Sequence, residues 1–153
     1  MATKFFLCTT CGNVVVKLVD SGVTPVCCGA EMIELKTNTS EAMTEKHLPI
    51  VTRIDDCTYK VTVSSEPHPM VDSHFIRFIF FETENGGQIK FLKSGEKAEA
   101  YFCGCKEKPV AVYEYCNLHG LWKSEIDALD KSCGTSKMSE QKCCGLKGKK
   151  ECR

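Results

Sequence analysis

The stretch HFIRFIFFET, residues 74–83, contains the longest apolar run of the chain. A strand with one buried face alternates apolar and polar residues, whereas this run is apolar at odd and even positions alike. It therefore predicts a strand that is covered on both faces, either central in a sheet or at an interface. The run is interrupted by Arg77 and is too short to cross a membrane.

Short strand patterns recur on both sides of this stretch, about ten residues apart. They are TYKVTVS (58–64), QIKFLK (88–93), EAYFCGC (99–105) and VAVYEYC (110–116). The first of them alternates clearly, with Tyr59, Val61 and Val63 on one face. Regular short strands joined by polar turns such as ENGG (84–87) predict an all-β sandwich or barrel.

The composition narrows the classes of function. The 153 residues include 20 Lys and Arg and 20 Asp and Glu, so the basic excess that favours nucleic acid or an anionic membrane is missing. The start, MATKFFLC, lacks the apolar core of a secretory signal, which predicts a soluble cytoplasmic protein. In a reducing cytoplasm, twelve cysteines favour metal or redox chemistry over disulfides.

The first 36 residues contain four cysteines, Cys8, Cys11, Cys27 and Cys28. Four thiolates can close a tetrahedral site around iron or zinc, so a structural zinc site is an alternative to an iron centre. Neighbouring side chains of an extended chain point to opposite faces, so the adjacent pair requires a sharp bend, which Gly29 permits. A unit of this size cannot bury a large core, and a metal would contribute to its folding. The polar residues 37–44 that follow are the predicted linker.

All four histidines of the chain lie in turn-like settings rather than inside apolar runs. They are His47, His68, His74 and His119. The last follows Cys116 by three residues in CNLHG (116–120), a spacing typical of metal ligands. A single histidine is usually a satisfied core or surface residue, so from spacing alone a shared metal site and four unrelated histidines both stay open.

The motifs EKHLP (45–49), HPM (68–70) with a further histidine at His74, and CNLHG together resemble superoxide reductase. With the four-cysteine segment in front of them, the chain is similar to desulfoferrodoxin, the two-iron form of that family. The resemblance covers about residues 1–127 and includes every histidine.

The resemblance implies an N-terminal desulforedoxin-like domain, here residues 1–36, with an iron on its four cysteines. It implies an immunoglobulin-like β domain, here residues 45–129, with a second, catalytic iron. The implied ligands of that iron are four imidazoles in a plane and an axial thiolate, here His47, His68, His74, His119 and Cys116. Imidazole and thiolate both suit iron, and five ligands leave a sixth position for substrate. Zinc could replace iron at the four cysteines.

The implied reaction is the one-electron reduction of superoxide to hydrogen peroxide without evolution of oxygen. The resemblance assigns roles to Glu45, which would close the sixth position after oxidation, and to Lys46, which would attract superoxide. It also implies a homodimer and an electron donor such as rubredoxin. These properties together predict an enzyme that detoxifies superoxide under oxidative stress.

Several cysteines lie outside the resemblance. Cys57, Cys103 and Cys105 are expected to be strand or turn thiols with an apolar rather than a redox role. The polar tail, residues 130–153, carries Cys133, Cys143, Cys144 and Cys152. These four could form a third metal site or disulfides, but a mobile tail with free thiols is the favoured interpretation.

Three other functions remain to be weighed against a superoxide reductase. A non-catalytic iron electron carrier is the leading alternative, although carriers usually saturate their metal. A zinc-ribbon interaction module would explain the first four cysteines but none of the histidines. Superoxide dismutation would differ from reduction by the evolution of oxygen.

Overall fold

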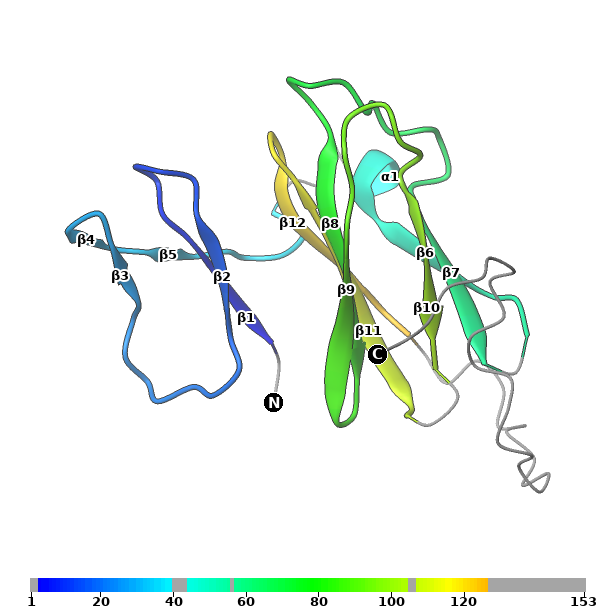
Figure 1. Ribbon diagram of the computed structural model, residues 1–153, viewed down its shortest axis with the longest axis horizontal. Coiled ribbons are helices and arrows are strands. Elements are labelled where there is room, and N and C mark those ends of the chain that lie inside the picture. Colours follow the sequence, from blue (N-terminus) through cyan, green and yellow to red (C-terminus); the bar gives the residue numbers. More distant parts are fainter. Residues whose placement is uncertain (1–2, 40–43, 56, 105–106, 127–153) are drawn as a thin grey trace, which may run out of the picture.

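The computed structural model describes residues 3–39, 44–55, 57–104 and 107–126. The N-terminal part consists of β1 (Lys4–Leu7), β2 (Val14–Lys17), β3 (Val26–Cys27), β4 (Ala30–Glu31) and β5 (Ile33–Glu34). The larger part consists of α1 (Thr44–His47), β6 (Pro49–Arg53), β7 (Thr58–Val63), β8 (Ile76–Thr83), β9 (Gly86–Phe91), β10 (Glu99–Cys103), β11 (Pro109–Cys116) and β12 (Gly120–Glu125). Figure 1 shows the two parts side by side, the N-terminal strands in blue at the left.

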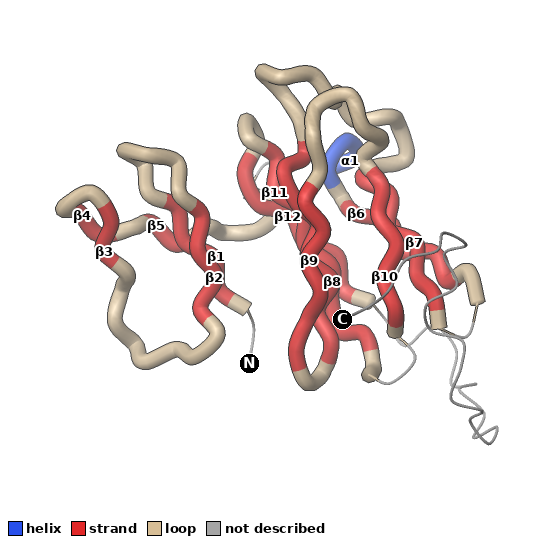
Figure 2. Tube along the Cα trace, viewed as in Figure 1, coloured by secondary structure: helices blue, strands red, loops and turns tan. Residues whose placement is uncertain are grey.

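The larger part is a sandwich of two antiparallel sheets, with strand orders β10-β7-β6 and β12-β11-β8-β9. Apart from the single turn of α1, every regular element in the described residues is a strand, as Figure 2 shows, so the predicted all-β class is confirmed. The core between the sheets includes Val61 and Val63 from β7, Phe81 from β8 and Val112 from β11. The predicted alternation of β7 is confirmed, because Tyr59, Val61 and Val63 are its buried residues.

Strand β8 lies between β11 and β9, and its two faces contact different layers. Ile79 and Phe81 belong to the core of the sandwich, whereas Phe78 and Phe80 lie on the opposite face of the sheet. That outer face is covered by Phe5 of β1, whose ring lies 5.9 Å from Phe78, 5.7 Å from Phe80 and 5.4 Å from Tyr113. The prediction of a strand that is buried on both faces is therefore confirmed, since the N-terminal sheet provides the second cover.

The segment after the N-terminal sheet continues along the edge of the sandwich. The side-chain amide of Asn38 donates to the carbonyl of Lys123 at 3.0 Å, and the Lys123 N–H donates back to its side-chain oxygen at 2.8 Å. Thr37 forms an isolated bridge with Leu121. The first residues of the predicted linker are thus hydrogen-bonded to β12. No helix in the described part of the chain has the length and apolarity needed to span a bilayer.

Candidate metal centres

The structure brings all four histidines and one cysteine together at one end of the sandwich. His47 ends α1, His68 and His74 lie in the loop between β7 and β8, Cys116 ends β11, and His119 lies in the turn before β12. Each offers one potential ligand atom, and these atoms lie within 4.8 Å of one another. Residues from four separate segments converge here, and they are the five that the resemblance assigns.

The four imidazole rings lie at the corners of a square. Neighbouring ring centroids are 4.6 Å apart for His47–His68, 4.6 Å for His68–His74, 4.8 Å for His74–His119 and 4.7 Å for His47–His119. A flat square of this size has a diagonal of about 6.6 Å, and the distance across it, from His47 to His74, is 6.5 Å. Four rings that surround one point in this way match an equatorial set of metal ligands.

Two of the histidines have one ring nitrogen occupied, which leaves the other nitrogen for a ligand. His68 Nδ1 lies 2.6 Å from the carbonyl oxygen of Pro69, and His47 Nδ1 lies 3.2 Å from Glu114 Oε1. The Nε2 atoms of His68 and His74 are buried and have no hydrogen-bond partner among the described residues. A buried imidazole nitrogen without a partner is costly, and a metal ion would satisfy it. The donor set therefore fits a metal.

The protonation of the histidines favours the same interpretation. Burial lowers the pKa of His47 to about 3 and that of His68 to about 4, and it lowers the pKa of His74 as well. These three imidazoles are therefore neutral at pH 7, which is the form that binds a metal. Burial raises the pKa of Cys116, so a nearby cation is needed to favour its thiolate.

Two buried side chains hold His47 in place. Glu114 of β11 is fully buried, accepts at His47 Nδ1, and has a second carboxylate oxygen without a partner in the described structure. The Trp122 ring stacks on the His47 ring, with centroids 4.9 Å apart and planes at 15°, and its Nε1–H donates to the carbonyl of His119. Carboxylates behind histidine ligands commonly fix ring orientation and the free nitrogen. Sequence reasoning missed both residues.

The loop that carries His119 is held by backbone conformation and by one asparagine. Gly120 adopts a φ of 78°, which an L side chain rarely adopts, so a glycine suits the tight turn after His119. Asn117 accepts from the Phe75 N–H at 2.8 Å and donates to the carbonyl of Ser73 at 3.0 Å. These bonds join the turn after Cys116 to the segment that carries His74.

The two predicted catalytic residues precede His47 on α1. Lys46 is exposed, and its positive charge contributes to the lowered pKa of His47, after burial and the other histidines. The side chain of Glu45 is not among those that the structure describes. The helix thus brings the charge of Lys46 near the square of imidazoles.

The second candidate centre lies in the N-terminal part. Cys8, Cys11, Cys27 and Cys28 present their sulfurs within 4.8 Å of one another. Cys8 is buried, whereas Cys11 and Cys28 are exposed. The predicted sharp bend at the adjacent pair is present: Cys28 has a φ of 52° and Gly29 a φ of 78°. The left-handed conformation of both residues lets neighbouring sulfurs reach one point.

Hydrogen bonds and crowding act on these thiols in opposite directions. Backbone N–H groups, that of Cys11 first, lower the pKa of Cys8 to about 6. Contact with the neighbouring sulfurs raises the pKa of Cys28 to about 12 and also raises that of Cys27. The group can hold one thiolate by itself but needs a cation to hold four, which is the behaviour of a four-sulfur metal site.

The structure corrects the expectation for two of the remaining cysteines. Cys103 is exposed, because the alternation of β10 buries Ala100 and Phe102 instead. Cys57 is disulfide-bonded rather than a thiol. The others, Cys105 and the four tail cysteines of residues 130–153, lie outside the described residues.

An all-β sandwich with four imidazoles and a thiolate around one point belongs to the class of proteins that can hold a single redox metal. The desulfoferrodoxin family model matches residues 39–125. The chain is 43% identical over 122 residues to the desulfoferrodoxin of Nitratidesulfovibrio vulgaris, covering 80% of this chain and 95% of that protein. The chain belongs to the desulfoferrodoxin family, which confirms the resemblance seen in the sequence.

Two further similarities concern proteins named superoxide reductase. The superoxide reductase of Pyrococcus horikoshii is 30% identical over 99 residues, covering 54% of this chain and 86% of that protein. The crystal structure of the superoxide reductase from Treponema pallidum aligns with a TM-score of 0.68 at 27% identity, covering 81% of this chain and 98% of that chain.

Proposed function

We propose that this protein is a cytoplasmic superoxide reductase that reduces superoxide to hydrogen peroxide in one-electron steps without evolving oxygen. The observation that carries the proposal is the square of four imidazoles beside Cys116, two of them buried and two partly buried, in a chain of the desulfoferrodoxin family. Iron at this point would supply the electron, and five protein donors are one fewer than an octahedral ion accepts.

The proposal assigns two irons per chain. The first is held by His47, His68, His74, His119 and Cys116, and the second by Cys8, Cys11, Cys27 and Cys28. The second belongs to a desulforedoxin-like domain of residues 1–36, joined by residues 37–44 to an immunoglobulin-like catalytic domain of residues 45–129, with residues 130–153 as a tail. Zinc is a substitute at the four cysteines, since thiolates bind both metals.

In this function the chain's own groups orient the ligands and attract the substrate. Glu114 and Trp122 fix the His47 ring, so that its second nitrogen faces the centre. The exposed charge of Lys46 would attract the superoxide anion toward the histidine group, and Glu45 would provide a carboxylate for the metal held there. A protonated lysine next to the site also orders water that can supply protons.

Replacing Lys46 with alanine should slow the capture of superoxide and reduce its dependence on ionic strength, because an exposed charge steers an anion through the solvent. Pulse radiolysis at low and high salt measures both effects. Lys36, which is exposed and paired with Glu34 in the N-terminal part, is the matched control. Equal rates for wild type and Lys46→Ala at low salt would remove the steering role.

The electron donor is proposed to be a small reduced protein such as rubredoxin, and the active form a homodimer. Four aliphatic side chains support an interface on the N-terminal part, because each is at least 66% exposed. They are Leu18, Val19, Val23 and Val26. Exposed apolar side chains of this kind are typical of contact surfaces.

The deciding experiment measures iron and zinc per chain, then superoxide consumed, peroxide formed and oxygen evolved. Peroxide equal to the superoxide consumed, with no oxygen, supports the reductase; oxygen and half as much peroxide would indicate dismutation. An iron protein that changes redox state with a donor but does not accelerate superoxide loss would be the alternative, a non-catalytic electron carrier. Protein reconstituted with zinc is the matched control, since it keeps both donor groups and lacks the redox change.

A further inference from the structure

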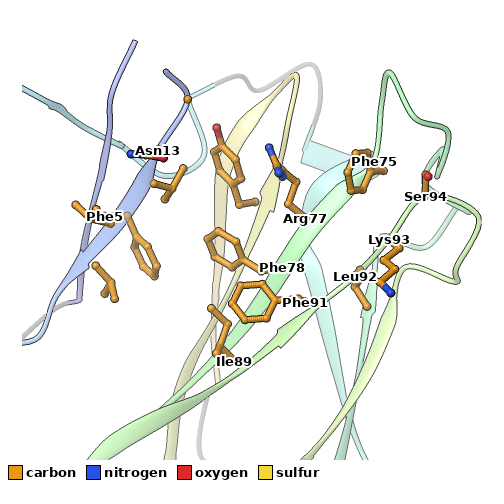
Figure 3. A pocket seen from close by; sticks show the side chains of 15 residues that line it. Phe5, Asn13, Phe75, Arg77, Phe78, Ile89, Phe91, Leu92, Lys93 and Ser94 are labelled. Atoms are coloured by element: carbon orange, nitrogen blue, oxygen red, sulfur yellow. The ribbon is translucent and has the colours of Figure 1, made fainter. Parts of the chain in front are cut away.

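A groove of about 820 Å³ runs between the N-terminal sheet and the outer face of the sandwich. Figure 3 shows Phe5 on one side of it and Phe78, Ile89 and Phe91 on the other. Its volume falls within the range of about 300–1,000 Å³ that small-molecule sites occupy. Neither candidate centre contributes a ligand residue to the lining of this groove.

The two long walls of the groove are apolar. Val14, Val15 and Val16 of β2 form one wall, and Phe78, Ile89 and Phe91 of β8 and β9 belong to the other. Both walls derive from β-sheet faces, so the space between them suits a flat molecule better than a spherical one. Aromatic rings on one wall offer stacking to a planar ring system.

Two side chains of the second wall are left exposed by the described segments. Phe91 is 75% exposed and Ile89 is 42% exposed, although both are large apolar side chains that line the groove. They lie on β9, an edge strand of its sheet. Burial of these two side chains by a ligand is therefore favourable by itself.

Positive charge is concentrated at one end of the groove. Arg77 and Lys93 line it, and none of the lining residues is an aspartate or a glutamate. Neither cation forms an ion pair with a carboxylate in the part of the chain that the structure describes. Arg77 packs over the Phe75 ring at 5.9 Å, which leaves its N–H groups for an anion.

The other lining residues with polar side chains are Asn13, Ser94 and Tyr115. Ser94 donates its hydroxyl hydrogen to Asp72, and the backbone N–H of Lys93 donates to Glu96 at 2.8 Å, so two carboxylates lie behind the rim without lining the groove. Asn13 comes two residues after Cys11, and Phe75 directly follows His74. The charged end of the groove thus lies between segments that carry the two candidate centres.

We infer that this groove binds a planar aromatic anion: a ring system enters between the valine wall and Phe91, and its anionic group binds Arg77 and Lys93. The inference rests on the apolar walls and the charge complementarity alone and does not require the proposed reductase activity. Flavin mononucleotide is the probe, because it has a flat three-ring system and a phosphate. Riboflavin, which has the same rings and no phosphate, is the matched neutral probe.

The test measures the affinity of the metal-loaded, full-length chain for both probes by flavin fluorescence polarisation. We expect flavin mononucleotide to bind about tenfold more tightly than riboflavin, and this difference to shrink as salt is added. Arg77→Gln combined with Lys93→Gln should remove the difference and leave riboflavin binding unchanged. Phe91→Ala should weaken both probes several-fold. Lys90→Gln, on β9 but outside the lining, should change neither.

Three results would overturn the inference. The first is that neither probe binds saturably up to about 1 mM. The second is equal affinity for the two probes, or an Arg77, Lys93 double variant that keeps wild-type affinity for flavin mononucleotide. The third is a sedimenting dimer that Phe91→Ala dissociates and that excludes both probes, since a second copy of the chain would then be the occupant. Melting temperature and metal content of each variant verify that the fold is kept.

Discussion

Replacing Glu114 with alanine should weaken metal binding at the histidine group and leave the four-cysteine group unchanged. Glu114 is fully buried, and its Oε1 lies 3.2 Å from His47 Nδ1, so the substitution leaves a buried ring nitrogen without its partner. Loss of such a partner typically weakens metal affinity about 10- to 100-fold, which corresponds to about 1.4–2.8 kcal/mol. The Trp122 ring still packs on His47, so we expect the lower half of this range rather than loss of the site.

The assay titrates metal-free protein with Co²⁺ against a competing chelator. Cobalt held by four thiolates absorbs differently from cobalt held by imidazoles and one thiolate, so the two groups are followed separately. Glu114→Gln keeps the size of the side chain and an acceptor oxygen, and should retain most of the affinity. Glu82→Ala is the control for removal of a buried carboxylate, because Glu82 pairs with Tyr113 on the far side of the sheet from the histidines.

One outcome would refute the positioning role of Glu114. If Glu114→Ala lowers the free energy of unfolding but binds Co²⁺ at the histidine group as tightly as wild type, then Glu114 is only a packing residue. The same conclusion follows if Glu82→Ala weakens that site by as much. A shift of the thiolate-to-cobalt band in Glu114→Ala and not in Glu82→Ala would support the role independently of affinity.

Three other perturbations test the structure. Phe5→Ala should lower the free energy of unfolding by about 3–5 kcal/mol, because Phe5 packs on Phe78, Phe80 and Tyr113. Protease should then cleave within residues 3–39 first. An unchanged midpoint of urea unfolding would contradict this packing. Cys28→Ser should lose the N-terminal metal and keep the histidine-bound metal, which elemental analysis measures; loss of both metals would disprove their independence. Metal-free protein should lose stability as the pH falls from about 6 toward 4, by about 1.4 kcal/mol per pH unit near pH 5, since the unfolded chain takes up protons on His47, His68 and His74, whose pKa values burial lowers in the fold. Burial raises the pKa of Glu114, so this group is already protonated in the fold and offsets one of the protons that the unfolded chain takes up. A stability that rises as the pH falls would contradict the predicted direction of the change.

The spacing of Cys8, Cys11, Cys27 and Cys28 predicted the four-cysteine group, whereas the histidine group was predicted only from the resemblance to superoxide reductase, because spacing alone left four unrelated histidines open. The burial pattern of β7 could also be predicted, because apolar and polar residues alternate along a strand that has one buried face. The prediction for Cys103 was wrong because the register of β10 decides which face is buried. The sequence around Cys103 fits a buried face and an exposed face equally well, and only the pairing of β10 with its neighbouring strand decides between them.

Glu114 shows why other parts of the site could not be predicted. In VAVYEYC a single glutamate reads as a polar residue on an exposed face, yet β11 is buried from Ala111 to Cys116. Val112 and Cys116 pack in the core of the sandwich, while Ala111 and Tyr113 lie on the face that Phe5 covers. The burial of both faces depends on a contact between residues more than a hundred positions apart, and no local pattern records it.

The two candidate centres differ in how much of the fold supports them before a metal binds. The residues of the histidine group come from four segments that the sandwich holds together. Trp122 and Glu114 fix the His47 ring without a metal. The four cysteines lie within one short segment, two of them are exposed, and the buried cluster around them adds only Phe6 and Met32. Close thiolates repel one another without a cation, whereas neutral imidazoles do not. The histidine group is therefore preformed in the core of the sandwich, whereas we expect the N-terminal part to depend more on its metal for stability, with Phe5 as its main contact with the sandwich.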